Sequence, residues 1–259
     1  MQLRDTHCLV TGASRGIGAA IARALAAKGA RLTLVARSSE SLAGICRELG
    51  ANALPADLAD PEHTAGLIDR AEALGGPLGV LVNNAGIEVS TPFAATSAAD
   101  VARIYAINLV APVELCRQVV PRFVERGGRI VNVSSMAANA GFPGMSTYCS
   151  TKAGLSHFGR LLRYELQGTK VGLTTVEVGP VPTDMLSGLT YPPIADSFAR
   201  LRRIGTMPNV SADDLAAAVA KAVERDRPHV WRPRRAVVFP MMTSLPQRIV
   251  EPLLRGVAR

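Results

Sequence analysis

An apolar run that ends at Val10 is followed by TGASRGIG (residues 11–18), and an amphipathic segment begins within that stretch. Its three glycines let the backbone turn sharply and approach other groups closely. A glycine-rich turn between a strand and a helix can hold a pyrophosphate on the free amide groups of the helix N-terminus. Such turns also serve as plain connections, so the interpretation depends on what surrounds this one.

Outward from this turn, short β-rich runs alternate with longer amphipathic segments. The expected strands are His7–Val10, Arg31–Val35, Ala51–Leu54, Gly79–Asn83, Arg129–Ser134 and Val171–Val178. The expected helices are Ile17–Lys28, Glu40–Leu49, Pro61–Ala73, Ala98–Arg126 and Tyr148–Gln167. This alternation predicts an α/β fold with a doubly wound parallel sheet and helices on both faces. Because no internal repeat or linker interrupts it, we expect residues 1–259 to form one domain.

The pattern weakens after Val178. The segment 183–208 is rich in Pro, Gly and Arg and has no clear period, and an irregular stretch of this length is often a lid. We therefore expect a substrate lid around residues 183–210. Ser211 is expected to cap a further helix whose first turn holds Asp213 and Asp214.

The last segment, around 236–259, is predicted to be an amphipathic extension. It is too short, and too interrupted by Pro240, Pro246 and Pro252, to cross a bilayer. Its apolar face can pack beside the lid of its own subunit, dock on a neighbouring subunit, or make peripheral contact with an anionic membrane. We rank these uses in that order, because packing is the commonest use of such a face.

Composition excludes several other classes of protein. The formal net charge is +8, but the basic residues are scattered and aromatic residues make up only 4% of the chain, so no nucleic-acid partner is expected. The four cysteines and four histidines show no metal-ligand spacing, so no metal is expected. The chain starts with a short polar stretch and holds no apolar run of bilayer length, so we expect a cytoplasmic protein.

Three motifs follow one another in a specific order. They are T-G-x-x-x-G-x-G at residues 11–18, N-N-A-G at residues 83–86, and Y-x-x-x-K from Tyr148 to Lys152. From the glycine loop to Thr183 the chain resembles the short-chain dehydrogenase/reductase family. The resemblance implies a Rossmann-type sheet of about seven strands and hydride transfer between a nicotinamide and a carbonyl or alcohol. It also implies a homo-oligomer, a dimer or tetramer, built on the helices after Ala98 and after Tyr148.

The end of the second expected strand bears on the choice of nicotinamide cofactor. Enzymes that use NAD usually carry an acid there to hold the ribose hydroxyls, but this chain has Ala36 and Arg37. Arg37 can pair with the 2′-phosphate of NADP(H), and Arg15 in the glycine loop can reach the same group. Both arginines can instead be solubility charges. Two of them at phosphate-side positions, with no acid, favour NADP(H).

Tyr148 and Lys152 are four residues apart, so they share one face of a helix. A free tyrosine has a pKa of about 10, and we expect the nearby ammonium group to lower it toward the range useful for acid–base catalysis. The resemblance adds Ser135, rather than Ser134, as the group that orients the substrate carbonyl. It also adds Asn108, which holds a water molecule that links Lys152 to solvent.

The resemblance thus implies a catalytic set and a cofactor-binding set. The catalytic residues are Asn108, Ser135, Tyr148 and Lys152. The cofactor-binding residues are Gly12, Ser14, Arg15, Gly16, Ile17, Gly18, Arg37, Asp57, Leu58, Asn84, Ala85, Gly86, Tyr148, Lys152, Val181 and Thr183. Asp57 is expected to hold the adenine amino group, and Val181 and Thr183 the nicotinamide carboxamide. Val178 departs from the family pattern, which has proline there.

The sequence leaves the substrate open. A 3-oxoacyl thioester competes with a free lipophilic carbonyl compound, and the basic run Ala199–Arg203 suits a phosphate-bearing acyl carrier or is a solvated helix face. The alternative outside enzymology is a non-catalytic NADP(H)-binding regulator on the same fold. Such proteins typically lose the tyrosine or the lysine, and this chain keeps both.

Overall fold

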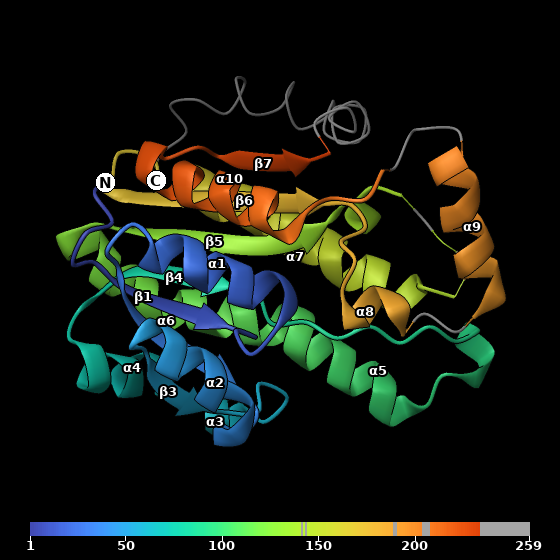
Figure 1. Ribbon diagram of the computed structural model, residues 1–259, viewed down its shortest axis with the longest axis horizontal. Coiled ribbons are helices and arrows are strands. Elements are labelled where there is room, and N and C mark those ends of the chain that lie inside the picture. Colours follow the sequence, from blue (N-terminus) through green and yellow to red (C-terminus); the bar gives the residue numbers. More distant parts are fainter. Residues whose placement is uncertain (141, 143, 189–190, 204–207, 234–259) are drawn as a thin grey trace.

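A computed structural model describes residues 1–140, 142, 144–188, 191–203 and 208–233. Its centre is a seven-stranded sheet in the order β3-β2-β1-β4-β5-β6-β7, and every pair of neighbouring strands is parallel (Figure 1). The strands are β1 (His7–Thr11), β2 (Arg31–Ala36), β3 (Asn52–Pro55), β4 (Leu78–Asn83), β5 (Gly128–Ser135), β6 (Val171–Val178) and β7 (His229–Arg232). The predicted doubly wound α/β fold is confirmed.

Helices cover both faces of this sheet. They are α1 (Gly16–Ala26), α2 (Ser39–Leu49), α3 (Pro61–Thr64), α4 (Leu67–Gly75), α5 (Ala98–Tyr105), α6 (Ala111–Arg126), α7 (Ser146–Glu165), α8 (Asp184–Ser187), α9 (Pro192–Arg203) and α10 (Ala212–Arg225). Two short 3₁₀ helices, Phe93–Ala95 and Met136–Ala138, and one π-helix, Ala106–Val110, complete the set in the described ranges.

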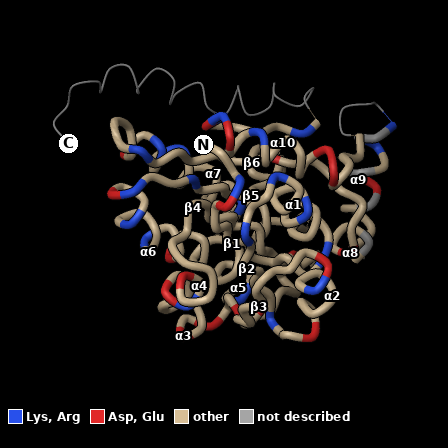
Figure 2. The backbone as a smooth tube through the Cα atoms, turned by 60° about the vertical axis from the view of Figure 1, so that its left-hand side comes forward, with Lys and Arg blue, Asp and Glu red and all other residues tan. Residues whose placement is uncertain are grey.

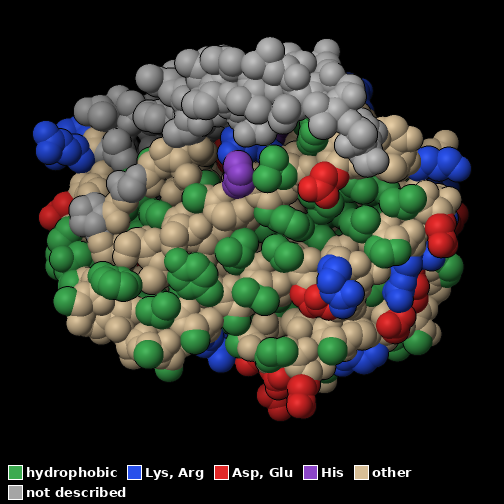
Figure 3. All heavy atoms as spheres, turned by 180° about the vertical axis from the view of Figure 1, so that it is seen from behind, with side chains coloured by type: hydrophobic (Ala, Val, Ile, Leu, Met, Phe, Trp, Pro, Cys, Tyr) green, Lys and Arg blue, Asp and Glu red, His purple; other side chains and the backbone are tan. Residues whose placement is uncertain are grey.

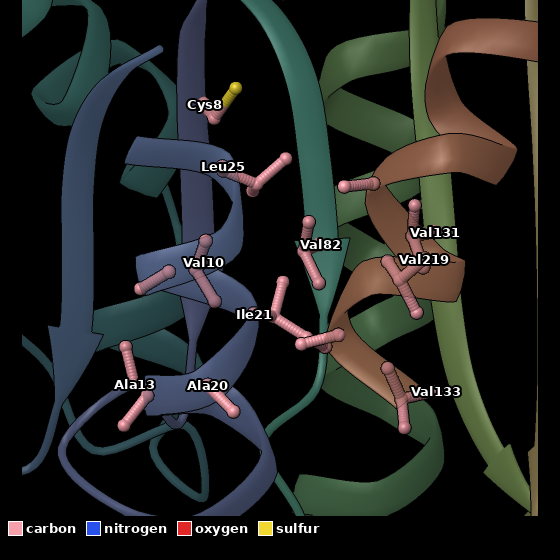
Figure 4. Close-up of a cluster of buried hydrophobic side chains, with 14 of the residues drawn as sticks. Cys8, Val10, Ala13, Ala20, Ile21, Leu25, Val82, Val131, Val133 and Val219 are labelled. Atoms are coloured by element: carbon pink, nitrogen blue, oxygen red, sulfur yellow. The ribbon is translucent and has the colours of Figure 1, made fainter. Parts of the chain in front are cut away.

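Two large apolar clusters hold the layers together. On one face, α1, α2 and α10 pack on the sheet, and Ile21, Leu25 and Val219 are fully buried against Val10 and Val82 (Figure 4). On the other face, α4, α6 and α7 bury a second cluster that includes Phe123. Because both faces of the central strands are covered, β6 is buried at all eight positions, which explains why Glu177 is its only charged residue.

Two of the predicted helices depart from a regular α-helix. The expected helix Ala98–Arg126 contains a π-helix at Ala106–Val110, because an extra residue is inserted into the helical ladder there. The expected helix Pro61–Ala73 is divided into α3 and α4, because Gly66 adopts a left-handed conformation with φ +63°. The prediction of one continuous helix is wrong for Pro61–Ala73, since hydrophobic periodicity persists across the break at Gly66. The segment Ala98–Arg126 stays helical through its π-helix.

The lid was expected to be irregular, and this expectation is wrong for much of its length. Helices α8 and α9 occupy it, on the side toward which the strand arrowheads point in Figure 1. Pro192 and Pro193 stand in the first turn of α9, where the missing amide hydrogens cost no hydrogen bond. Prolines that look disruptive in the sequence thus start a helix here.

The seventh strand, β7, was not among the six strands predicted from the sequence. It has only four residues, His229–Arg232, between Pro228 and Pro233, and it pairs with β6 from Thr175 to Val178. The predicted C-terminal extension around 236–259 lies outside the described residues. In the described part of the chain, no helix is long and apolar enough to cross a membrane. Figure 2 shows Lys and Arg interspersed with Asp and Glu.

Candidate active site

The glycine loop forms a close-packed cradle between β1 and α1. Gly12 and Gly16 have φ angles of +64° and +57°, which residues with a side chain rarely adopt. A Cβ atom on Gly12 would lie 2.7 Å from the Cα atom of Ala85, and one on Gly18 would collide with the Gly12 carbonyl oxygen. No side chain caps the start of α1 and no acid lies in its first turn, so its amide groups and its positive dipole end suit a phosphate.

The N-N-A-G segment ties this cradle to the next strand. The side-chain amide of Asn84 donates hydrogen bonds to the carbonyl oxygens of Thr11 at 2.9 Å and Gly12 at 3.1 Å. In return, the Thr11 hydroxyl oxygen accepts hydrogen bonds from the backbone amides of Asn84 and Ala85. A Cβ atom on Gly86 would lie 3.4 Å from Lys152 Nζ, so the segment runs from the cradle to Lys152.

The residues expected on the adenosine side line up at the ends of β2 and β3. Arg37 follows β2 and is exposed. Asp57 follows β3, where its carboxylate accepts hydrogen bonds from Arg103 at 3.1 Å and from the amide of Ala59 at 3.0 Å. Burial raises the pKa of Asp57, but these two hydrogen bonds and the positive charges of Arg103 and Arg37 outweigh it, so the net shift is downward. The Leu58 side chain is buried in the core, which leaves its backbone to contact a ligand.

Arg15 has a partner that the sequence did not indicate. Its guanidinium group lies 2.8 Å from the carboxylate of Asp184, the first residue of α8, and both side chains are 72% exposed. Exposed ion pairs of this kind contribute little stability, so the contact can exchange for a phosphate. The glycine loop and the lid therefore meet at Arg15.

Three of the four expected catalytic side chains converge at the carboxyl end of β5. Lys152 Nζ donates a hydrogen bond of 3.0 Å to the carbonyl oxygen of Val133 and lies 5.8 Å from the centre of the Tyr148 ring. Ser135 ends β5 and lines the same cavity as Tyr148. The neighbouring Ser134 is buried and its hydroxyl donates to the backbone of Lys152 at 2.9 Å, so Ser135 is the serine available to a substrate.

Asn108, the fourth, lies in the π-helix and is fully buried. Its side chain accepts a hydrogen bond from the amide of Ile87 and donates one to the carbonyl oxygen of the same residue, both at 2.9 Å. It also donates to the Thr151 hydroxyl at 3.2 Å. Asn108 thus fixes the segment after β4 against α7, beside Lys152.

Burial dominates the pKa values of the pair. Burial raises the pKa of Tyr148 to about 12, although a hydrogen bond with Ser135 lowers it in part. Burial lowers the pKa of Lys152 to about 8, because a buried ammonium group loses hydration. The expectation that Lys152 brings the pKa of Tyr148 below its usual value is therefore wrong for the protein alone.

The cavity beside Tyr148 is largely apolar. Besides Ser135, Tyr148 and Glu88, its wall includes Ile17, Met136, Ala137, Phe142, Met145, Val178, Val181, Thr183, Met185 and Leu186. Val181 and Thr183 thus lie at its edge, and Thr183 also approaches Gly16 of the phosphate cradle. Ile194 of α9 is fully buried with Met145 in a small cluster that Phe142, Tyr148 and Tyr191 join. The lid therefore packs directly over Tyr148.

Among the residues that line this cavity, Glu88 carries the charge that the sequence analysis did not identify. Its carboxylate lies two residues beyond Gly86, within the otherwise uncharged stretch 87–99, and burial raises its pKa to about 7. An isolated acid between Ile87 and Val89 was the available signal. Whether this acid lines the cavity depends on the direction of its side chain, which only the folded structure shows.

One family profile matches most of this chain. The profile described as short chain dehydrogenase matches residues 6–191. The ketoacyl reductase HetN of Nostoc sp. is 39% identical over 222 residues, which cover 83% of this chain and 74% of that protein. The D-erythrulose reductase of Gallus gallus is 33% identical over 222 residues, which cover 85% of this chain and 88% of that protein.

A solved structure agrees with these sequence matches. It is the blue fluorescent protein from a metagenomic library, crystallised in complex with NADPH. It superposes with a TM-score of 0.80 at 30% sequence identity, and the match covers 92% of this chain and all of that chain.

Proposed function

This chain belongs to the short-chain dehydrogenase family, and from that premise we propose that it transfers a hydride between NADP(H) and a carbonyl or alcohol substrate. The observation that carries the proposal is the position of Tyr148 and Ser135 in the wall of one cavity, with the Lys152 ammonium group beneath the tyrosine ring. The glycine cradle opens beside that cavity through Ile17 and Thr183.

NADP(H) rather than NAD(H) is supported by the end of β2. Arg37 is exposed there and no carboxylate occupies the neighbouring positions 36 and 38, so a 2′-phosphate meets a positive charge instead of a negative one. Arg15 adds a second positive charge from the glycine loop once it leaves Asp184. The similarity to a protein crystallised with NADPH points the same way.

Each polar group has a defined task in the proposed reaction. When bound, the reduced nicotinamide supplies the hydride. Ser135 donates a hydrogen bond to the carbonyl oxygen, and Tyr148 gives its proton to that oxygen as negative charge develops on it. Lys152 stabilises the resulting phenolate by its positive charge. Lys152 then passes a proton back to the phenolate. Asn108 positions the Ile87 segment and is proposed to hold the water molecule through which Lys152 regains a proton from solvent.

The substrate class is narrowed by the cavity and by the relatives. An apolar wall favours a carbonyl compound with an apolar body. A 3-oxoacyl thioester is the second candidate, because HetN carries the name ketoacyl reductase and Arg200 and Arg203 are exposed on α9. The name of D-erythrulose reductase describes the reduction of a sugar ketone, which shows that related chains are named for small polar substrates too.

We also propose a homo-oligomer. Val110, Val124 and Leu161 are exposed on the helices that follow Ala98 and Tyr148, with exposed fractions of 59%, 43% and 37%. Figure 3 shows hydrophobic side chains exposed on the side opposite to that of Figure 1. A second copy of this chain would cover such a surface.

A panel of carbonyl compounds tests the proposed reaction. The purified full-length chain is mixed with NADPH and, in turn, a 3-oxoacyl thioester, hydroxy ketones, aryl ketones and long-chain aldehydes, while NADPH absorbance is followed. Consumption that depends on one of these compounds supports the proposal. Tight NADPH binding without consumption on any of them would instead favour a non-catalytic NADP(H)-binding regulator.

A further inference from the structure

Glu88 places a carboxylate in the wall of the catalytic cavity. It lies in the segment that follows β4, and its side chain lines the cavity together with Ser135 and Tyr148. Asn108 fixes the preceding residue, Ile87, by two hydrogen bonds, so the backbone that carries Glu88 is held firmly. The position of the carboxylate is therefore set by the same residue that supports the catalytic lysine.

One oxygen of this carboxylate has no hydrogen-bond donor. Oε2 accepts a hydrogen bond from the Ser90 hydroxyl at 3.1 Å, whereas Oε1 is inaccessible to solvent and has no partner among the described residues. No Lys, Arg or His of the described chain forms an ion pair with it. A buried acceptor without a donor is costly, and a native protein normally avoids it unless a ligand supplies the donor.

Glu177 is a buried acid with a structural role and can be compared with Glu88. It is also buried, but it accepts a hydrogen bond of 2.9 Å from the indole nitrogen of Trp231 and lies in the sheet away from the cavity. Glu88 lines the cavity, has only a serine hydroxyl on one oxygen, and has no hydrogen-bond partner on the other among the described residues. Its charge is also close enough to the catalytic site to raise the pKa of Tyr148.

We propose that Glu88 is a specificity-determining residue that accepts a hydrogen bond from a hydroxyl group of the substrate, one or two carbons from the reacting carbonyl. The inference rests on the proposed function and deepens it, because it names the substrate class as hydroxy ketones with an apolar body. The carbonyl oxygen then meets Ser135 and Tyr148, the Glu88 carboxylate turns so that its unpaired oxygen meets the hydroxyl group, and the remainder contacts the apolar wall.

This arrangement selects against two other classes of ketone. A ketone without the hydroxyl group leaves the buried oxygen unpaired, and sites built for a hydroxyl reject such analogues strongly. A 2-oxo acid brings a second carboxylate toward Glu88, and the two like charges repel in a poorly hydrated cavity. The site therefore prefers an uncharged hydroxylated ketone to both.

The test uses ketones that differ in one group. They are acetophenone and α-hydroxyacetophenone, propiophenone and β-hydroxypropiophenone, and the anion phenylglyoxylate. kcat/KM is measured with NADPH for the wild-type chain and for Glu88→Leu and Glu88→Gln. Glu125→Gln is the matched control, because Glu125 is an exposed acid on α6 and its loss changes the net charge equally.

The wild-type chain should prefer at least one hydroxylated ketone over its parent by about tenfold or more. Glu88→Leu should lose this preference, chiefly because kcat/KM for the hydroxylated ketone falls. Glu88→Gln should gain activity on phenylglyoxylate, and Glu125→Gln should behave as wild type. An unchanged ratio in Glu88→Leu, with both parent ketones still reduced, would overturn the proposal while leaving the proposed function intact.

A binding measurement distinguishes a failure of the Glu88 proposal from a failure of the proposed reaction. The rise in melting temperature caused by each ketone is recorded for the NADPH-loaded wild type and for Glu88→Leu. A larger rise with the hydroxylated ketone that disappears in Glu88→Leu supports the site, even if no ketone is reduced and the proposed reaction is wrong. Equal rises for hydroxylated and parent ketones in both proteins overturn it.

Discussion

Lys152 Nζ lies 5.8 Å from the centre of the Tyr148 ring but donates its hydrogen bond to the carbonyl oxygen of Val133 in β5. The lysine is therefore anchored by the sheet and not by the tyrosine hydroxyl. A change at the tyrosine that keeps the ring leaves this anchor in place, so the contributions of the two residues can be separated by mutation.

Tyr148→Phe should abolish turnover and leave NADPH binding nearly intact. Only the proton donor is removed, and loss of a positioned acid typically lowers the rate by about 10²–10⁴-fold. Steady-state kinetics with the best ketone and a fluorescence titration with NADPH measure the two effects. Retention of most of the wild-type rate would show that another group delivers the proton.

Arg37→Asp should reverse or flatten the preference for NADPH over NADH. Loss of a charge-assisted hydrogen bond corresponds to roughly 10- to 150-fold weaker binding of the phosphorylated cofactor. Titrations with both cofactors check this, and Arg47→Asp, an equal change at an exposed position of α2, is the control. Equal wild-type affinity for NADPH and NADH would contradict the role given to Arg37.

Gly18→Ala should impair both stability and NADPH binding. Its Cβ atom would collide with the Gly12 carbonyl oxygen and the Asn84 side chain, so the cradle must shift at a cost of about 1–3 kcal/mol. Gly44→Ala is the matched control, because nothing lies within 4 Å of its Cβ and alanine favours the helix by about 0.5–1 kcal/mol. Thermal melts should thus move in opposite directions, and a Gly18→Ala melt equal to wild type would contradict the tight packing of the loop.

The stability difference between Glu88→Gln and wild type should depend on pH. Burial raises the pKa of Glu88 from 4.5 to about 7, so the protonated form is favoured in the folded protein and ionisation destabilises it. This favourable contribution is complete below about pH 4.5 and is lost as the pH rises through 7. Glu88→Gln should therefore melt close to wild type at pH 5 and above it at pH 8.5, and an equal difference at both pH values would contradict the pKa shift.

The sequence alone predicted the sheet well, because the short apolar runs of the central strands reflect burial on both faces. It missed β7, since four residues with a histidine and an arginine at the ends carry no such pattern and pair only because β6 presents a free edge. It also missed the break at Gly66 and the π-helix at Asn108, because single inserted or left-handed residues hardly change the spacing of apolar side chains.

The residues of the candidate site were likewise predicted only in part from the sequence. The motifs indicated Tyr148, Lys152 and Ser135, whose side chains lie together at the end of β5. They did not indicate the pKa of Tyr148, which depends on how much water burial removes. Nor did they indicate Glu88. They also missed the pair of Arg15 and Asp184, which lie 169 residues apart in the sequence and are brought together by tertiary packing.

Helix α9 covers the cavity through a small cluster centred on Met145 and Ile194, apart from the two clusters that hold the sheet. Each buried side chain of this size contributes about 1.5–3 kcal/mol, so undocking α9 requires far less free energy than unfolding the sheet. Its amide hydrogens should then exchange by local opening, independently of global stability. If the product of the proposed reaction leaves through this opening, a more tightly packed lid slows turnover even when the hydride step is unchanged.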